Sequence, residues 1–190
     1  MSERLIQEQL YTYEQWLNLD IDGRSELIDG HIYMMADPTG RHQEVLSELN
    51  GQIWTFLRDK PCQVFFAPFS VRLFKYKNTA YEPDLVVICD PSIRRQRGCV
   101  GAPDMIVEVL SRSTAKMDKV KKYNDYLQAG IKEYWIVDPD KDFIDAYRLM
   151  DGRYVLRTYY KDDIAPVQVL PGCEIDLSLV FQDIFEDPDK

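Results

Sequence analysis

Residues 103–111 (PDMIVEVLS) place one carboxylate in the middle of an apolar run. The apolar residues in this run would occupy both faces of a strand, which is typical of a strand covered on both sides. By the two-residue period of a strand, Glu108 shares a face with Ile106 and Leu110. An unpaired charge buried there costs several kcal/mol. The sequence therefore predicts either a salt bridge or a metal ion beside Glu108.

A second carboxylate, Asp84, begins the apolar strand expected over residues 84–89 (DLVVIC), directly after Pro83. Proline suits a strand entrance, where no ladder donor is needed. If the strands that carry Asp84 and Glu108 are neighbours, the two carboxylates converge at one edge of a sheet. A divalent cation relieves their repulsion, and Mg²⁺, or Mn²⁺ in its place, suits such oxygen ligands. The simpler interpretation of Asp84 is a turn or capping residue.

The amino-acid composition limits the classes of protein to which this chain can belong. The chain has 190 residues, 45% of them hydrophobic, and a net charge of −9. This balance predicts one folded domain and argues against a large basic surface for nucleic acid. It does not exclude a nucleic-acid enzyme, because carboxylates that hold metal ions count as negative until the metal binds. The one basic cluster in a loop consists of Arg94, Arg95 and Arg97. This segment is either a solvated loop or a contact with a nucleic-acid backbone.

The four cysteines show no CxxC spacing and are expected to be free thiols in a reducing cytoplasm. The first ten residues are charged and do not resemble a secretion signal. No apolar run approaches the length of a membrane span. We therefore expect a cytoplasmic protein without a membrane partner.

The pattern of elements predicts a single mixed α/β domain over residues 1–190, with a central mixed sheet, flanking helices and a C-terminal β-meander. A hairpin is expected over residues 25–35, and residues 91–101 are read as a polar loop. The expected helices cover residues 12–19, 41–59 and 113–129, with Thr12 and Gly130 as caps. The expected strands cover residues 63–67, 70–74, 84–89, 103–111, 133–138, 143–148 and 154–160.

The ordered motifs resemble the PD-(D/E)XK nuclease superfamily and, within it, the Uma family of restriction endonucleases. The resemblance covers roughly residues 10–180 and rests on the combination of several short matches. It implies a restriction-endonuclease-like core, an endonuclease that hydrolyses DNA with Mg²⁺, and a homodimer, since cutting both strands needs two sites. The matching pieces are ELIDG at 26–30, His42, EPD at 82–84, residues 103–114, Asp118-x-x-x-Lys122-x-x-x-Tyr126 and GIKEYWIVDP at 130–139.

The resemblance also implies roles for individual residues. Asp84 and Glu108 would bind the metal, and Glu26 would join them as an acidic helper near the metal or its water. The position two after Glu108 is Leu110, where a standard nuclease of this superfamily has its catalytic lysine. In the Uma family a lysine of the following helix takes over this role, and Lys122 holds that position. Such a lysine would orient the attacking water and neutralise charge in the transition state.

Helical periodicity agrees only in part with this assignment. Val120, Tyr123 and Leu127 define an apolar face from which Lys122 points away, so Lys122 could equally be a solvated lysine. Lys119 lies closer to that face and is the alternative catalytic lysine. Ser111, Ser113 and Thr114 are candidate helix caps, and Tyr126 is expected to pack in the core.

His42, at the start of the long helix, has two interpretations. It is either a partly buried, hydrogen-bonded histidine or a catalytic residue that contacts a phosphate or Glu26. The whole chain likewise has an alternative function. It would be a catalytically silent module that keeps the nuclease fold and binds nucleic acid or protein; a weaker alternative is a metal-dependent hydrolase of nucleotides or RNA.

Overall fold

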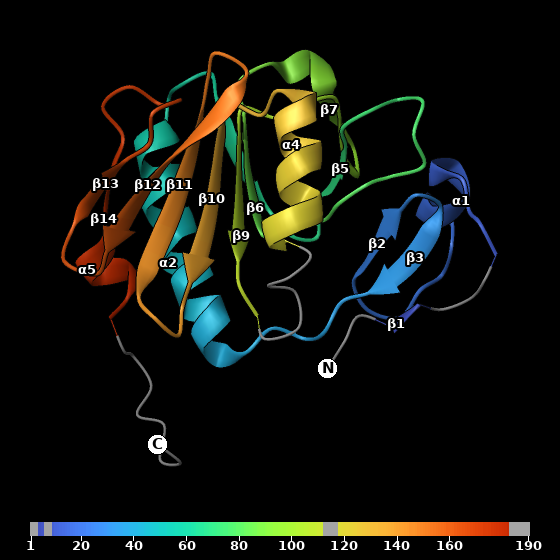
Figure 1. The fold of residues 1–190 in the computed structure, drawn as a ribbon, viewed down its shortest axis with the longest axis horizontal. Coiled ribbons are helices and arrows are strands. Elements are labelled where there is room, and N and C mark those ends of the chain that lie inside the picture. Colours follow the sequence, from blue (N-terminus) through green and yellow to red (C-terminus); the bar gives the residue numbers. More distant parts are fainter. Residues whose placement is uncertain (1–3, 6–8, 112–117, 183–190) are drawn as a thin grey trace.

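A six-stranded mixed sheet forms the centre of the protein in the computed structural model, which describes residues 4–5, 9–111 and 118–182 (Figure 1). β9 and β10 pair in parallel, whereas the other neighbours are antiparallel. The expected mixed sheet and the meander β10–β11–β12 are confirmed. In sheet order the strands are β12 (Arg153–Tyr160), β11 (Phe143–Met150), β10 (Glu133–Asp138), β9 (Met105–Val109), β6 (Leu85–Ile88) and β4 (Gln63–Phe66).

Three smaller sheets surround the central one. The expected hairpin is β2 (Ser25–Ile28) with β3 (His31–Met34), and β1 (Arg4–Leu5) adds to it. β13 (Ile164–Pro166) pairs with β14 (Glu174–Asp176). The third sheet contains β5 (Ser70–Arg72), β8 (Gly98–Val100) and β7 (Arg94–Arg95), after the 3-10 helix η1 (Pro91–Ile93).

The loop expected over residues 91–101 was therefore wrong, since this segment holds η1 and the β7–β8 hairpin. β8 pairs in parallel with β5, far away in the sequence. A strand of three residues that depends on such a distant partner has no local signature, because tertiary pairing and not propensity fixes it.

Local signals explain where the helices begin and end. α1 (Tyr13–Leu17) starts at Thr12, which forms a capping box with Gln15. α2 (Gly40–Leu57) starts at Thr39, whose hydroxyl accepts the backbone N–H of His42 at 3.2 Å. α4 (Tyr123–Ala129) ends at Gly130, which has a left-handed backbone with φ of 79°.

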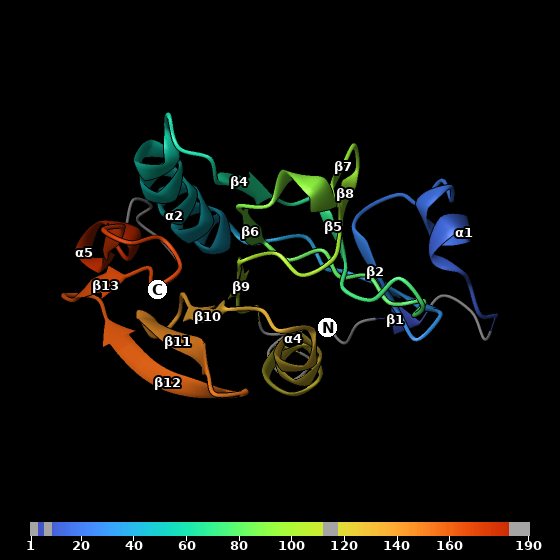
Figure 2. The same cartoon turned by 90° about the horizontal axis from the view of Figure 1, so that it is seen from above.

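Helices cover both faces of the central sheet (Figure 2). α2 packs on one face together with α5 (Leu177–Val180) and the β13–β14 pair, whereas α4 lies on the other. Alternation along the strands follows these layers: Val87 and Val107 face α2, and Val86 and Ile106 face α4. Glu108 follows Ile106 by two residues and so belongs to the α4 side. No helix among the described residues is long and apolar enough to cross a bilayer.

The buried face of the helical segment that bears Lys122 differs from the periodicity prediction. Val120 has 59% of its surface exposed, whereas Lys122 is only 1% exposed and Tyr126 is fully buried. The segment begins as a π-helix, η2 (Asp118–Lys122), whose wider turn shifts side chains relative to the regular 3.6-residue period. The expected start of this helix, with the caps Ser113 and Thr114, lies outside the described residues.

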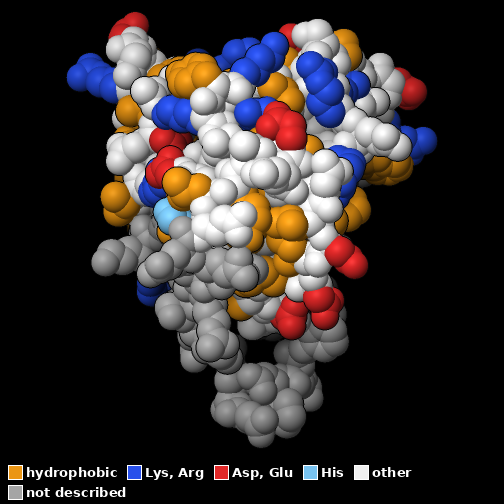
Figure 3. All heavy atoms as spheres, turned by 90° about the vertical axis from the view of Figure 1, so that its right-hand side faces the viewer, with side chains coloured by type: hydrophobic (Ala, Val, Ile, Leu, Met, Phe, Trp, Pro, Cys, Tyr) orange, Lys and Arg blue, Asp and Glu red, His pale blue; other side chains and the backbone are white. Residues whose placement is uncertain are grey.

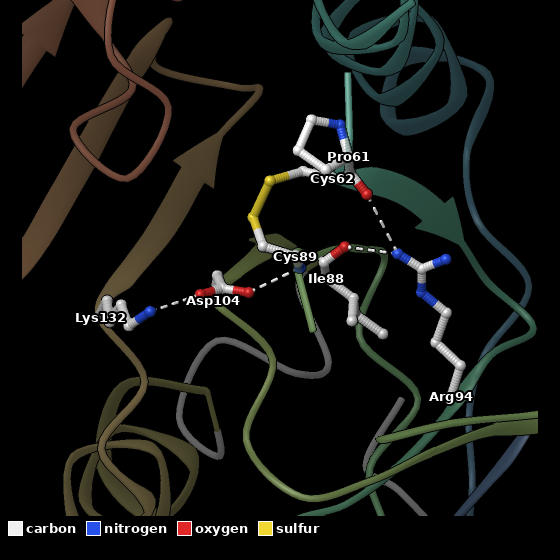
Figure 4. Close-up of a disulfide and its surroundings, with 7 residues drawn as sticks. All are labelled: Pro61, Cys62, Ile88, Cys89, Arg94, Asp104 and Lys132. Atoms are coloured by element: carbon white, nitrogen blue, oxygen red, sulfur yellow. Dashed lines mark hydrogen bonds and ion pairs between the residues drawn. A yellow bond between two sulfur atoms is a disulfide. The ribbon is translucent and has the colours of Figure 1, made fainter. Parts of the chain in front are cut away.

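Two of the four cysteines are not free thiols, which corrects the sequence-based expectation. Cys62 and Cys89 form a disulfide that links the outer ends of β4 and β6 (Figure 4). The ladder pairs Gln63 with Ile88, so the next residues outward, Cys62 and Cys89, lie directly opposite, with Cα atoms 3.9 Å apart. Cysteine spacing along the chain cannot reveal such a register. Cys99 and Cys173 are free and buried.

Reduction of this disulfide is expected to destabilise the protein. The bond joins residues 27 positions apart, so its loss would restore about 3–4 kcal/mol of loop entropy to the unfolded chain. We expect dithiothreitol to lower the melting temperature by roughly 10 °C. Cys62→Ser should show the same lower value with and without reductant. Alkylation of all four cysteines after unfolding in urea without reductant would contradict the bond, which predicts that only Cys99 and Cys173 react.

Candidate active site

The register of the central sheet brings Asp84 and Glu108 together. β6 and β9 are antiparallel, with Leu85 opposite Val107 and Val86 opposite Ile106. Continuing this register by one residue places Asp84 directly opposite Glu108. Both carboxylates are buried, with exposed fractions of 4% and 3%. The two carboxylates singled out in the sequence therefore converge at one end of two neighbouring strands.

Asp84 is surrounded by hydrogen-bond donors. Its Oδ2 accepts the backbone N–H of Val109 at 2.9 Å and lies 3.2 Å from Nε2 of His42. The Arg24 guanidinium lies 3.5 Å from its Oδ1. Burial alone would raise the pKa of Asp84, but the contacts with His42, Val109 and Arg24 together hold that pKa below its usual value. The site therefore keeps this carboxylate ionised.

Lys122 is the compensating cation beside Glu108. Its Nζ lies 3.0 Å from Oε1 of Glu108 and 2.9 Å from Oε1 of Glu26, and all three side chains are almost completely buried. The Tyr126 hydroxyl, one helical turn beyond Lys122, donates to the same Glu108 oxygen at 2.7 Å. β2, β9 and the η2–α4 segment thus supply one buried cluster of alternating charge.

Glu26 and His42 occupy supporting positions. The Glu26 oxygen that faces Lys122 also accepts the backbone N–H of Glu82 at 3.0 Å, which ties β2 to the segment before β6. His42 contacts Asp84. One interpretation of the sequence had predicted a contact between His42 and Glu26. Among the described residues, Oε2 of Glu26 and Nδ1 of His42 are buried without a hydrogen-bond partner. Two polar atoms of the site therefore have unused hydrogen-bonding capacity.

A small cavity of about 30 Å³ lies between these side chains. This volume admits one ion or one or two water molecules. Carboxylates are the ligands that Mg²⁺ prefers, and this ion needs only one or two of them because it keeps several waters. Asp84 and Glu108 are therefore ligands of a chemical type that suits Mg²⁺. The charged and polar side chains that line the cavity include Arg24, His42, Asp84, Glu108, Ser111 and Lys122.

The structure does not gather the three predicted ligands Asp84, Glu108 and Glu26 around one point. Within the described ranges, no group of three or more His, Cys, Asp or Glu side chains is close enough to hold a metal. Glu26 meets Glu108 through the Lys122 ammonium, which lies between them. The ligand pair compatible with this arrangement is Asp84 and Glu108.

Two residues of the site were not identified from the sequence. Arg24 lies directly before β2 and has no pattern that sets it apart from a surface arginine. Tyr126 was expected only to pack; it is buried, but its hydroxyl also binds Glu108. Its spacing of four residues from Lys122 was the one available signal, because residues at i and i+4 share a helix face. The side chain of Lys119, the alternative lysine, lies outside what the structure describes.

The mixed sheet and its flanking helices form a restriction-endonuclease-like nuclease fold. A solved structure with this fold is "a putative nuclease belonging to DUF820" from Anabaena variabilis, with a TM-score of 0.72 and 24% identity, over 90% of this chain and 97% of the other. A family model described as "Putative restriction endonuclease" (Uma2) matches residues 10–178. The chain therefore belongs to the Uma2 family.

Two curated relatives come from Synechocystis, and both are called uncharacterized. One, slr1290, is 27% identical over 153 residues, which cover 80% of each chain. The other, sll1609, is 25% identical over 148 residues, which cover 76% of this chain and 83% of the relative. The similarity thus extends over most of both proteins.

Proposed function

We propose that this protein is a Mg²⁺-dependent endonuclease that hydrolyses phosphodiester bonds in DNA. The observation that carries the proposal is the placement of Asp84, Glu108 and Lys122 around one small buried cavity. A structural salt bridge alone would need only the pair of Lys122 with one carboxylate. The second carboxylate opposite Glu108, and the cavity between them, favour a site for chemistry.

Asp84 and Glu108 would hold the metal ion. When bound, Mg²⁺ supplies activation of a water molecule and stabilisation of the charge that develops on the phosphate. His42 and the Val109 N–H orient the Asp84 carboxylate. Tyr126 and Lys122 do the same for Glu108. These contacts fix both carboxylates before substrate arrives, so that little reorganisation is needed during the reaction.

Lys122 would act on the substrate side of the site. Its ammonium borders the cavity and is held by Glu26 and Glu108. From there it would orient the attacking water and offset negative charge in the transition state. Glu26, whose second oxygen has no hydrogen-bond partner among the described residues, would position Lys122 or accept a hydrogen bond from that water.

DNA as substrate is favoured by the family description, which names a restriction endonuclease. A homodimer follows from the need to cut two strands. We infer a cytoplasmic location because the DNA lies there. Thiol reductants in that compartment act against the Cys62–Cys89 bond.

A catalytically silent module is the second candidate. It is favoured by the partners that the two carboxylates already have, since Arg24, His42 and Lys122 compensate them without a metal. The net charge of −9 also disfavours binding to phosphates. Cleavage assays separate the two candidates.

Cleavage of supercoiled plasmid is the test of the proposed activity. We expect purified wild-type protein to nick or linearise plasmid in Mg²⁺ or Mn²⁺ and to lose this activity in EDTA. Glu108→Gln should reduce the rate at least about 100-fold. Asp163→Asn, which is remote from the site, should cut like wild type. Equal rates for wild type and Glu108→Gln would identify a contaminant, and no cleavage of DNA by any preparation would favour the silent module.

A further inference from the structure

A second, larger cleft adjoins the candidate active site. Its volume is about 600 Å³, which falls within the range of small-molecule sites, roughly 300–1,000 Å³. Arg24 and Asp37 line both this cleft and the small cavity between the carboxylates. The two hollows are therefore neighbours that share a wall. The proposed chemistry at Asp84 and Glu108 uses only the small one.

Arg24 is the structural link between the two hollows. One terminal nitrogen lies 3.5 Å from Oδ1 of Asp84, and the other donates to the backbone carbonyl of Glu82 at 3.0 Å. Its Nε forms an ion pair with Oε2 of Glu82, which also lines the cleft, at 3.7 Å; both atoms are buried and have no hydrogen-bond partner among the described residues. An anionic group in the cleft beside this guanidinium would be separated from the candidate metal ligand Asp84 by the Arg24 side chain, which lines both spaces. Phosphate is the anion that such a planar donor group recognises well.

The outer walls of the cleft combine two kinds of surface. Leu17, Leu19 and Ile21 form an apolar wall at and after the end of α1. Gln96 and Arg97, in the exposed turn of the β7–β8 hairpin, form a polar and basic wall. Basic side chains also gather in the upper part of the face that carries α1 (Figure 3). A ligand with a flat apolar body, hydrogen-bonding edges and a phosphate would contact all of these surfaces.

We propose that this cleft binds one unpaired nucleotide of the substrate strand, next to the phosphodiester that is cut. The base lies against the apolar wall, its edge faces Gln96, and its phosphates contact Arg24 and Arg97. A base inside an intact duplex is stacked and paired, so it enters such a cleft only if it is single-stranded or extruded. The proposal rests on the proposed function for the identity of the reacting phosphate.

Binding in EDTA tests this cleft without any cleavage. The probes are a fluorescein-labelled single-stranded oligonucleotide, its fully paired duplex and the same duplex with a central mismatch, each measured by anisotropy. We expect the single strand to bind at least about tenfold more tightly than the paired duplex, because the duplex must unpair and unstack a base, at a cost of a few kcal/mol, before that base can enter the cleft. The mismatched duplex should fall between them, because a mismatch lowers the cost of extrusion. A paired duplex that binds as tightly as the single strand would overturn the proposal.

Matched variants locate the binding. Arg97→Glu should weaken single-strand binding about tenfold or more, because it places a negative charge beside a phosphate. Arg95→Glu makes the same charge change in the same hairpin, outside the residues that line the cleft, and should have less than a threefold effect. Leu19→Glu should also weaken binding, whereas Leu179→Glu, within α5, should not. Equal losses for Arg97→Glu and Arg95→Glu would indicate general electrostatics and refute the cleft.

The outcomes also separate this inference from the proposed function. If plasmid is cut but Arg97→Glu binds single strands like wild type, the cleft proposal fails alone. If the predicted binding pattern holds but no preparation cuts DNA, the cleft stands as a nucleotide site and the enzymatic proposal fails.

Discussion

Replacement of Lys122 by methionine is expected to abolish cleavage and to destabilise the fold by about 3–5 kcal/mol. Lys122 is 1% exposed and lies within 3.0 Å of an oxygen of both Glu26 and Glu108. Methionine fills similar space but leaves two buried carboxylates without their shared cation. Like charges at short distance then repel, which adds to the cost of burial. Urea denaturation at pH 7 measures the loss of stability, and plasmid cleavage at 20 °C measures the loss of activity.

Two further variants test these expectations one at a time, the first for stability and the second for cleavage. Lys122→Met combined with Glu26→Gln and Glu108→Gln should recover most of the lost stability, because no unpaired charge remains in the core. Lys119→Met replaces the alternative lysine on the same segment and should retain activity. If Lys122→Met cuts DNA at the wild-type rate while Lys119→Met is inactive, the assignment of the catalytic lysine is wrong.

The strand that bears Glu108 shows what the sequence could predict. A carboxylate within an apolar run required a compensating partner, and the strand period placed it on the correct face. Whether that partner was a metal or a side chain could not be decided, because both alternatives give the same sequence pattern in the strand. The structure places the Lys122 ammonium there and leaves a small cavity on the Asp84 side.

Features that depend on packing or on contacts between distant segments could not be predicted from sequence patterns. The prediction that Lys122 points away from the buried helix face was wrong, because a buried lysine paired with two carboxylates has the same sequence pattern as a solvated lysine. A π-helical start also displaces the side chains from the regular period. Arg24 and the Cys62–Cys89 pair depend on contacts between segments far apart in the chain. No local rule encodes such contacts.

The second large effect expected from the site is stabilisation by a divalent cation. Any ligand that binds only the folded state stabilises it, by about 2.7 kcal/mol at a concentration one hundred times its dissociation constant. For a domain of this size, we expect saturating Mn²⁺ to raise the melting temperature by about 5–10 °C. Asp84→Asn should abolish this shift, because an amide is a much weaker ligand for a hard cation.

The ionisation of Asp84 sets the pH at which this effect is measured. Its pKa is lowered in the folded protein, so its contribution to stability is complete above the unfolded value of about 3.9. That contribution is lost as the pH falls through the lower folded value. At pH 7 the Asp84 carboxylate is therefore charged, and protonation of this group does not compete with metal binding.

The melting temperature of wild type and Asp84→Asn, with and without Mn²⁺ at pH 7, tests the central claim most directly. It reports on this protein alone, whereas cleavage also reports on traces of contaminating nuclease. Asp163→Asn serves as the control for a general effect of losing one carboxylate. We predict a shift of about 5–10 °C in wild type and Asp163→Asn, and none in Asp84→Asn. The absence of a shift in wild type, or the same shift in Asp84→Asn, would contradict a metal site at Asp84 and Glu108.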